Sequence, residues 1–168
     1  SMNQSLIDRL VAHRGYRGRY PENSHASIKA AIDAGARHVE FDVQMNAEQD
    51  LVLIHDETFD RTSDVTLGLF GATTEQTRAI SIHEPERFGI AFYPEPTWLL
   101  ADLLEYSRPY TQVQLYIEIK EESLDHWGLE TVMNRLFARI EDYPNPITII
   151  SFDYDAIAHC LEKSSYPC

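Results

Sequence analysis

Two segments of the chain, residues 38–44 and 114–120, alternate apolar and polar side chains with the period of two that a β-strand imposes. The apolar positions are Val, Ile, Leu or Phe, so one face of each strand is expected to be buried. The opposite faces carry Glu40, Asp42, Gln44, Tyr116, Glu118 and Lys120. Carboxylates held close together repel one another unless a cation or a proton offsets their charge. The pattern therefore predicts a metal site on a β-sheet.

Further apolar segments predict an α/β fold. Ser24 is expected to cap a helix that Gly35 ends, and Thr97 a leucine-rich helix. A helix over 129–140 and a last helix with Ile157, Cys160 and Leu161 on its apolar face follow. Strands are expected at 10–13, 38–44, 114–120 and 147–150, and a short strand at 51–55 is expected to return beside the second of them. Because strands and helices alternate, the strands should be parallel, with right-handed crossovers.

Residues 56–94 have no sustained periodicity and are punctuated by glycine and proline. A long irregular segment in a compact domain is often a lid or a binding element. A surface insertion without a role explains the same pattern equally well, so both interpretations stay open.

The composition excludes several classes of protein. The 168 residues hold 14 Lys and Arg against 27 Asp and Glu, a net charge of −13, which argues against nucleic acid as a partner. No stretch is long enough to span a membrane, and residues 2–5 lack the start of a signal peptide, so a cytoplasmic location is expected. Cys160 and Cys168 are too few and too late for a disulfide framework or a zinc cluster, and Cys160 is expected to be a small buried hydrophobic residue.

Ionisable residues recur where predicted strands end, at His13, Arg14, His55, Glu118 and Lys120. Parallel sheets form their sites at the carboxyl ends of the strands, so these groups should meet. His13 and His55 could act as general acid and base. Arg14 and Lys120 offer the fixed positive charge that suits a phosphate. Together these groups favour phosphodiester cleavage over acyl transfer, because no nucleophile-elbow motif is present.

The carboxylates of the first strand, Glu40 and Asp42, together with Glu118 form the expected metal site. Oxygen ligands favour a hard cation, Mg²⁺ or Ca²⁺, over zinc. Each feature also has a plainer explanation. Glu118 and Lys120 could be a surface ion pair, Glu40 and Asp42 the solvated face of an edge strand, and either histidine a structural hydrogen-bond partner.

Several motifs in order resemble those of the glycerophosphodiester phosphodiesterase family over nearly the whole chain. They are Ala12-His13-Arg14-Gly15, Pro21-Glu22-Asn23-Ser24, Glu40-Phe41-Asp42-Val43-Gln44, His55-Asp56-Glu57-Thr58, Asp60-Arg61-Thr62 and Ile117-Glu118-Ile119-Lys120. The resemblance implies a TIM-barrel-type (β/α)₈ fold with a small insertion after its second strand, which corresponds to residues 56–94.

By the same resemblance, Glu40, Asp42 and Glu118 are metal ligands, His13 and His55 the acid–base pair, and Arg14 and Lys120 phosphate-binding residues. The implied reaction converts glycerophosphodiesters into glycerol 3-phosphate and an alcohol. A glycerol hydroxyl attacks the phosphorus first, and water then opens the cyclic phosphate.

The chain departs from the family in two ways. The turn usually written Thr-x-Asp-Gly reads Asn46-Ala47-Glu48-Gln49. A (β/α)₈ domain needs about 250 residues, so residues 1–168 are expected to be a partial domain with only the first four β/α units. Two copies could pair, a second-half chain could complete the barrel, or the piece could derive from a larger protein. Two rival functions follow: a non-catalytic half-barrel that keeps the metal site, and a related phospholipase or sphingomyelinase-like lyase.

Overall fold

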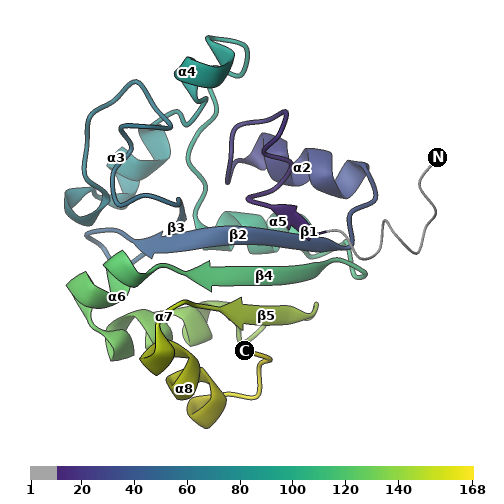
Figure 1. Cartoon of the computed structure of the whole chain (residues 1–168), viewed down its shortest axis with the longest axis vertical. Coiled ribbons are helices and arrows are strands. Elements are labelled where there is room, and N and C mark those ends of the chain that lie inside the picture. The colour runs from purple at the N-terminus through teal and green to yellow at the C-terminus, as the bar shows by residue number, and fades with distance from the viewer. Residues whose placement is uncertain (1–10) are drawn as a thin grey trace.

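The computed structural model describes residues 11–168. At its centre is a β-sheet whose strands run from side to side in Figure 1. The sheet order is β1-β2-β4-β5, with β3 added to β2. The strands are β1 (Val11–His13), β2 (His38–Met45), β3 (Leu51–Leu53), β4 (Gln114–Ile119) and β5 (Ile147–Ile150). β1, β2, β4 and β5 are parallel, whereas β3 returns antiparallel to the end of β2. The predicted parallel α/β architecture is confirmed.

Helices connect the strands, and α6, α7 and α8 lie on the opposite side of the strands from α3 and α4 in Figure 1. The main helices are α2 (His25–Asp33), α5 (Leu100–Ser107), α6 (Glu121–Trp127), α7 (Leu129–Ile140) and α8 (Tyr154–Lys163). Between β3 and α5 lie the 3₁₀-helix η1 (Leu69–Gly71), α3 (Thr74–Ala79) and α4 (Pro85–Phe88).

β2 pairs with β1, β3 and β4, and the side chains on both of its faces are buried. Its apolar residues Val39, Phe41 and Val43 enter the main core, where none is more than 1% exposed. Its polar residues Glu40 and Asp42 are only 5% and 1% exposed. The structure thus rules out the plainer explanation of a solvated edge strand, and the charged groups of β2 need partners inside the protein.

A second, smaller hydrophobic core joins residues 56–94 to the residues on either side of them. Its buried members are Val52, Ile54, Phe59, Leu69, Ile80, Ile82 and Leu99. This cluster combines β3 with side chains from across the segment, so the segment is packed against the sheet. Capping boxes at Thr73 and at Ser24 start α3 and α2, the second as the sequence predicts.

Four details of the predicted elements were wrong. Thr97 does not cap α5: its hydroxyl donates to the Ile80 carbonyl at 2.9 Å, and the Asp102 carboxylate accepts the Leu99 N–H instead. Helix α6 was not anticipated, and the strand expected over 51–55 ends at Leu53. Leu161 is 64% exposed rather than part of the apolar face of α8. Leu10 and residues 2–5 lie outside the described part of the chain.

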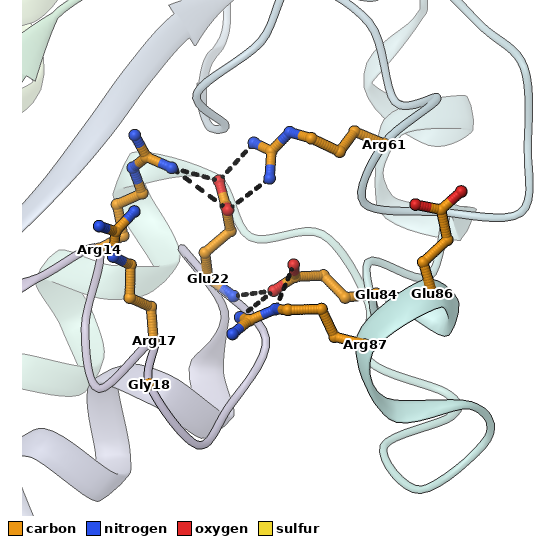
Figure 2. A pocket seen from close by; sticks show the side chains of 8 residues that line it. All are labelled: Arg14, Arg17, Gly18, Glu22, Arg61, Glu84, Glu86 and Arg87. Carbon is orange, nitrogen blue, oxygen red and sulfur yellow. Dashed lines mark hydrogen bonds and ion pairs between the residues drawn. The ribbon is translucent and has the colours of Figure 1, made fainter.

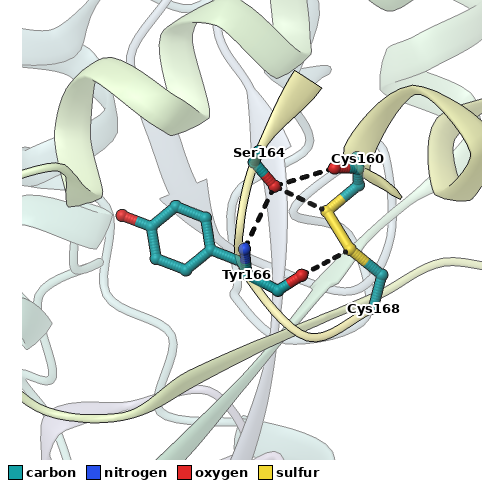
Figure 3. Close-up of a disulfide and its surroundings, with 4 residues drawn as sticks. All are labelled: Cys160, Ser164, Tyr166 and Cys168. Atoms are coloured by element: carbon teal, nitrogen blue, oxygen red, sulfur yellow. Dashed lines mark hydrogen bonds between the residues drawn. A yellow bond between two sulfur atoms is a disulfide. The ribbon is translucent and has the colours of Figure 1, made fainter. Parts of the chain in front are cut away.

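The two cysteines form a disulfide, contrary to expectation (Figure 3). Cys160 is fully buried, as predicted, but the chain turns back after α8 and brings Cys168 to it. The Ser164 hydroxyl, which donates to the Cys160 carbonyl at 2.8 Å, holds this turn. Disulfides persist mainly in oxidising compartments. The cytoplasmic location therefore stays a prediction, and this bond is the observation against it.

Within residues 11–168 the sheet does not close on itself. β1 and β5 are its two edges, and Val11 on β1 is 50% exposed. The backbone beside β5 begins a further pairing, because the Ile149 N–H donates to the Pro167 carbonyl at 2.9 Å. None of the helices in this described range combines the length and the apolar character that crossing a bilayer requires.

Candidate active site

The strand register brings the three predicted carboxylates together. In the parallel pairing Glu40 lies opposite His13, and Asp42 lies opposite Glu118. One carboxylate oxygen from each of Glu40, Asp42 and Glu118 lies within 4.8 Å of the others. All three side chains are buried, so each strand contributes a rigidly held oxygen donor to the same point.

The carboxylates oppose one another electrostatically. Burial, followed by the charges of Asp42 and Glu118, raises the pKa of Glu40 to about 8. Burial also raises the pKa of Asp42. Glu40 Oε1 and Asp42 Oδ1 are buried and make no hydrogen bond with any described residue. Because buried carboxylate oxygens need a positive partner, this donor set fits a hard divalent cation such as Mg²⁺ or Ca²⁺.

The two predicted catalytic histidines are held by carboxylates. His13 Nε2 lies 3.1 Å from Glu40 Oε2, and the side chain is 49% exposed. Burial and the nearby charges of Arg17 and Arg14 lower the pKa of His13. His55 Nδ1 lies 2.7 Å from Asp56 Oδ1. Both rings therefore have one nitrogen in a defined contact, which leaves the other for proton transfer.

The two predicted phosphate-binding cations lie against the carboxylates. Arg14 Nε is 3.3 Å from Asp42 Oδ2, and Lys120 Nζ is 2.9 Å from Glu118 Oε2. Burial lowers the pKa of Lys120, but the contact with Glu118 outweighs it, so the net shift is upward. Lys120 thus stays charged. The structure brings together the ends of β1, β2, β3 and β4, which carry the predicted site residues.

Two residues of the β1–α2 loop also belong to the site and were quoted only as part of a motif. Asn23 Nδ2 donates to Asp42 Oδ2 at 3.1 Å, and the Asp42 N–H donates to Asn23 Oδ1 at 3.2 Å. Glu22 is 4% exposed and accepts from Arg61 at 2.7 and 2.8 Å, as well as from Arg14. The Pro21-Glu22-Asn23 sequence signals a turn, but nothing in its spacing shows that the turn folds over β2.

A pocket of about 480 Å³ adjoins the carboxylates, between the β1–α2 loop and α4 (Figure 2). It is lined by Arg14, Arg17, Gly18, Glu22, Arg61, Glu84, Glu86 and Arg87. Arg14 lines the pocket and also contacts Asp42, so it forms the wall between the pocket and the carboxylate cluster.

Parallel strands that alternate with helices and carry charged groups at their carboxyl ends define an open (β/α)-barrel protein with a site in the barrel-type position. The chain belongs to the glycerophosphoryl diester phosphodiesterase family, whose sequence model matches residues 13–168. The resemblance drawn from the motifs is thereby confirmed.

Individual relatives support the same assignment. A glycerophosphodiester phosphodiesterase of Bacillus altitudinis is 30% identical over 157 residues, which cover 90% of this chain and 61% of the relative. Glycerophosphodiester phosphodiesterase 1 of Bos taurus is 44% identical over 71 residues, which cover 42% of this chain and 22% of the relative.

Solved structures confirm the TIM-barrel type of fold. An Oleispira antarctica phosphodiesterase, solved with the product sn-glycerol-3-phosphate, superposes with a TM-score of 0.82 at 24% identity. The match covers 95% of this chain and 63% of that one. A glycerophosphodiester phosphodiesterase of Thermotoga maritima gives a TM-score of 0.70 at 25% identity over 93% of this chain and 59% of that one. The chain therefore spans about three fifths of the length of these relatives.

Proposed function

We propose that this chain supplies the metal- and phosphate-binding part of an enzyme that hydrolyses glycerophosphodiesters to glycerol 3-phosphate and an alcohol. The observation that carries the proposal is the convergence of Glu40, Asp42 and Glu118 within 4.8 Å, with His13 bound to Glu40. The family assignment supports the substrate class. The product bound to the Oleispira antarctica relative supports it as well.

Glu40, Asp42 and Glu118 would hold the divalent cation, Mg²⁺ or Ca²⁺. Once bound, such an ion polarises a phosphoryl oxygen and neutralises charge that develops on it. Arg14 and Lys120 stand beside the same carboxylates and orient the anionic phosphodiester.

His13 and His55 exchange the protons of the reaction. One imidazole accepts the proton of the attacking glycerol hydroxyl, and the other donates a proton to the oxygen of the leaving alcohol. Asp56 orients the His55 ring through its 2.7 Å contact with Nδ1. Although burial raises the pKa of Asp56, the hydrogen bonds from Arg61 and His55 lower it overall, so Asp56 stays an anion.

The open sheet leaves room for further protein to complete the barrel. β1 and β5 are edge strands within the described residues, and an open parallel sheet exposes both edges to pairing. A second copy of this chain, which we favour, a separate second-half polypeptide, or the rest of a larger protein would fill this place. Light scattering measures the mass of the purified chain in solution. A dimer mass supports self-association, and a monomer mass contradicts it.

The enzymatic proposal is tested by the release of glycerol 3-phosphate from glycerophosphocholine in Mg²⁺ or Ca²⁺. We expect EDTA and Asp42→Asn to abolish the release, whereas Asp142→Asn, at an exposed position after α7, leaves it unchanged. Release that continues in EDTA would contradict the metal site. A cyclic phosphate as the final product would instead identify a lyase of the phospholipase or sphingomyelinase-like type.

The open sheet favours one rival function, a half-barrel that binds the ion but does not turn over substrate. Calorimetric binding of Mg²⁺ or Ca²⁺ without product release, from a sample whose mass is that of the single chain, would establish this rival.

A further inference from the structure

The pocket beside the carboxylates holds more positive charge than the phosphate-binding residues require. Four arginines line it, namely Arg14, Arg17, Arg61 and Arg87, against three glutamates. In Figure 2 Arg14 and Arg17 come from the β1–α2 loop, Arg61 from the loop that follows β3, and Arg87 from α4. The pocket is thus built by three segments that are separate in the sequence.

Three of these arginines are already paired. Arg14 and Arg61 share Glu22, which is 4% exposed, and Arg61 also binds Asp56. Arg87 binds Glu84 at 2.7 and 2.9 Å. These ion pairs fix the walls of the pocket, and their charges are largely cancelled.

Arg17 is the exception. Among residues 11–168 no carboxylate forms an ion pair or a hydrogen bond with its guanidinium. Glu86, on the far wall in Figure 2, is the one pocket glutamate that is likewise unpaired within this range. Arg17 therefore presents an uncompensated guanidinium to the cavity, next to the fixed ion pairs.

The position of Arg17 links the pocket to the reacting groups. Arg17 and His13 both line a second pocket, of about 450 Å³, and Arg17 and Gly18 line the first pocket as well. A ligand group bound by Arg17 would consequently lie close to His13, while Arg14 separates the same ligand from Asp42. Because Arg14 lines the pocket and also contacts Asp42, a phosphodiester bound by Arg14 would lie at the edge of the pocket.

We propose that this pocket binds the alcohol portion of the substrate, and that Arg17 selects alcohols that carry an anionic group. This inference rests on the proposed function for the identity of the substrate. Glycerol, the other portion, is small and uncharged, so it needs neither a charged lining nor a cavity of about 480 Å³. A planar guanidinium binds a carboxylate or a phosphate through two parallel hydrogen bonds. The preferred substrates are glycerophosphodiesters such as glycerophosphoserine.

The test uses two probes that the enzyme cannot turn over, O-phosphoserine and phosphoethanolamine. They differ only by the carboxylate, and both carry an ammonium, so any contribution of Glu86 cancels in the comparison. We expect calorimetry in the presence of Ca²⁺ to give a Kd about tenfold lower for phosphoserine, because its carboxylate adds a charge-assisted hydrogen bond to Arg17.

Arg17→Gln should bring the two Kd values within about twofold of each other while leaving the Kd of phosphoethanolamine unchanged. Arg19→Gln is the matched control, because Arg19 is exposed on the same loop but does not line the pocket, and it should keep the tenfold preference. Equal Kd values in the unmodified protein, a preference that survives Arg17→Gln, or no binding of either probe would overturn the proposal.

Hydrolysis separates this inference from the proposed function. If a preference for phosphoserine is found but neither glycerophosphoserine nor glycerophosphoethanolamine is cleaved, the pocket assignment stands and the enzymatic proposal fails. If both glycerophosphodiesters are cleaved at equal kcat/KM and the two probes bind with equal Kd, the enzymatic proposal stands and the role proposed for Arg17 is wrong.

Discussion

Asn23 and Asp42 bind each other at both ends of the asparagine amide: Asn23 Nδ2 donates to Asp42 Oδ2, and Asn23 Oδ1 accepts the Asp42 N–H. Asn23 reaches this position in the left-handed region, at φ 53°. The pair occupies Asp42 Oδ2 and leaves Oδ1 without a hydrogen bond in the described structure. Asn23, together with Arg14 at 3.3 Å from the same oxygen, therefore holds Asp42 Oδ2 and leaves Oδ1 for an ion.

Loss of this orientation should weaken metal binding. Asn23→Gly removes the amide but tolerates the positive φ, and we expect the affinity for Mg²⁺ or Ca²⁺ to fall about 10–100-fold, as for other residues that orient a ligand. Calorimetry measures it, with exposed Asn134→Ala on α7 as the control. An affinity within a factor of about two of the unmodified protein would show that Asp42 needs no such support.

The stabilising effect of the divalent ion should grow with pH. Without the ion, the pKa of Glu40 is raised to about 8 from the ordinary 4.5. Between these values the unfolded chain loses the proton and the folded chain keeps it, so stability falls as the pH rises. The ion replaces the proton at the cluster. We expect Mg²⁺ or Ca²⁺ to raise Tm more at pH 8 than at pH 5, and Glu40→Gln to flatten this difference. An equal rise in Tm at both pH values would contradict the replacement of the Glu40 proton by the ion.

Glu22 should be essential for the stability of the loop over the site. Burial raises its pKa, but the hydrogen bond and charge of Arg61 and the charge of Arg14 lower it overall. Its contribution is therefore present above pH 4.5 and is lost as the pH falls through the lowered pKa.

Glu22→Gln leaves Arg14 and Arg61 without their shared counter-charge. We expect a loss of about 3 kcal/mol in the free energy of unfolding at pH 7, measured by urea denaturation. The variant should also lose less stability than the unmodified protein when acidified below pH 4.5. Glu162→Gln, at a side chain 74% exposed, is the control and should change stability by less than about 0.5 kcal/mol.

His13 should affect turnover rather than folding. His13→Gln removes a proton-transfer group, and kcat for glycerophosphodiesters should fall about 10²–10⁴-fold. Because the side chain is 49% exposed, Tm should change little. His159 lies on α8, and its ring stacks on Phe137 of α7; His159→Gln serves as the control for the loss of an imidazole. A kcat for His13→Gln equal to that of the control would remove His13 from the mechanism.

Gly15 permits the close approach of the β1–α2 loop to α2. It adopts φ +74°, and a Cβ there would lie 2.3 Å from Ser27 Oγ. Gly15→Ala should therefore cost about 1–3 kcal/mol of stability, measured by chemical denaturation. Gly18→Ala tests the same substitution in the same loop where the nearest atom, on Tyr16, is 4.0 Å away, and it should be nearly neutral. Equal effects of the two variants would contradict the steric explanation.

The alternation of β2 and β4 was sufficient to predict which carboxylates meet. Because the buried face excludes a shift by one residue, Glu40, Asp42 and Glu118 must share a face when Phe41 and Ile117 pack in the core. A shift by two residues would keep that face, so the exact pairing of Asp42 with Glu118 is known only from the structure. The ends of β1 and β3, with His13 and His55, could be predicted for the same reason, because strand ends in such sheets share an edge.

The loops and the tail could not be predicted in this way. Asn23 acts through Asp42, 19 positions away, and Glu22 binds Arg61, 39 positions away, and no local period encodes these contacts. Thr97 looked like a helix cap, but a hydrogen bond to Ile80, 17 residues earlier, competes successfully for its hydroxyl. The Cys160–Cys168 bond likewise depends on the turn at Ser164, which composition does not reveal.

β2 pairs with three other strands, and it carries two of the three clustered carboxylates. Its backbone amides should exchange with solvent only when much of the sheet opens. The proposed metal site thus lies on a strand that is held firmly within the sheet, whereas the surrounding loops can change in sequence more freely during evolution. Substitutions in those loops can therefore change the substrate specificity of a relative without displacing the carboxylate oxygens of the proposed metal site.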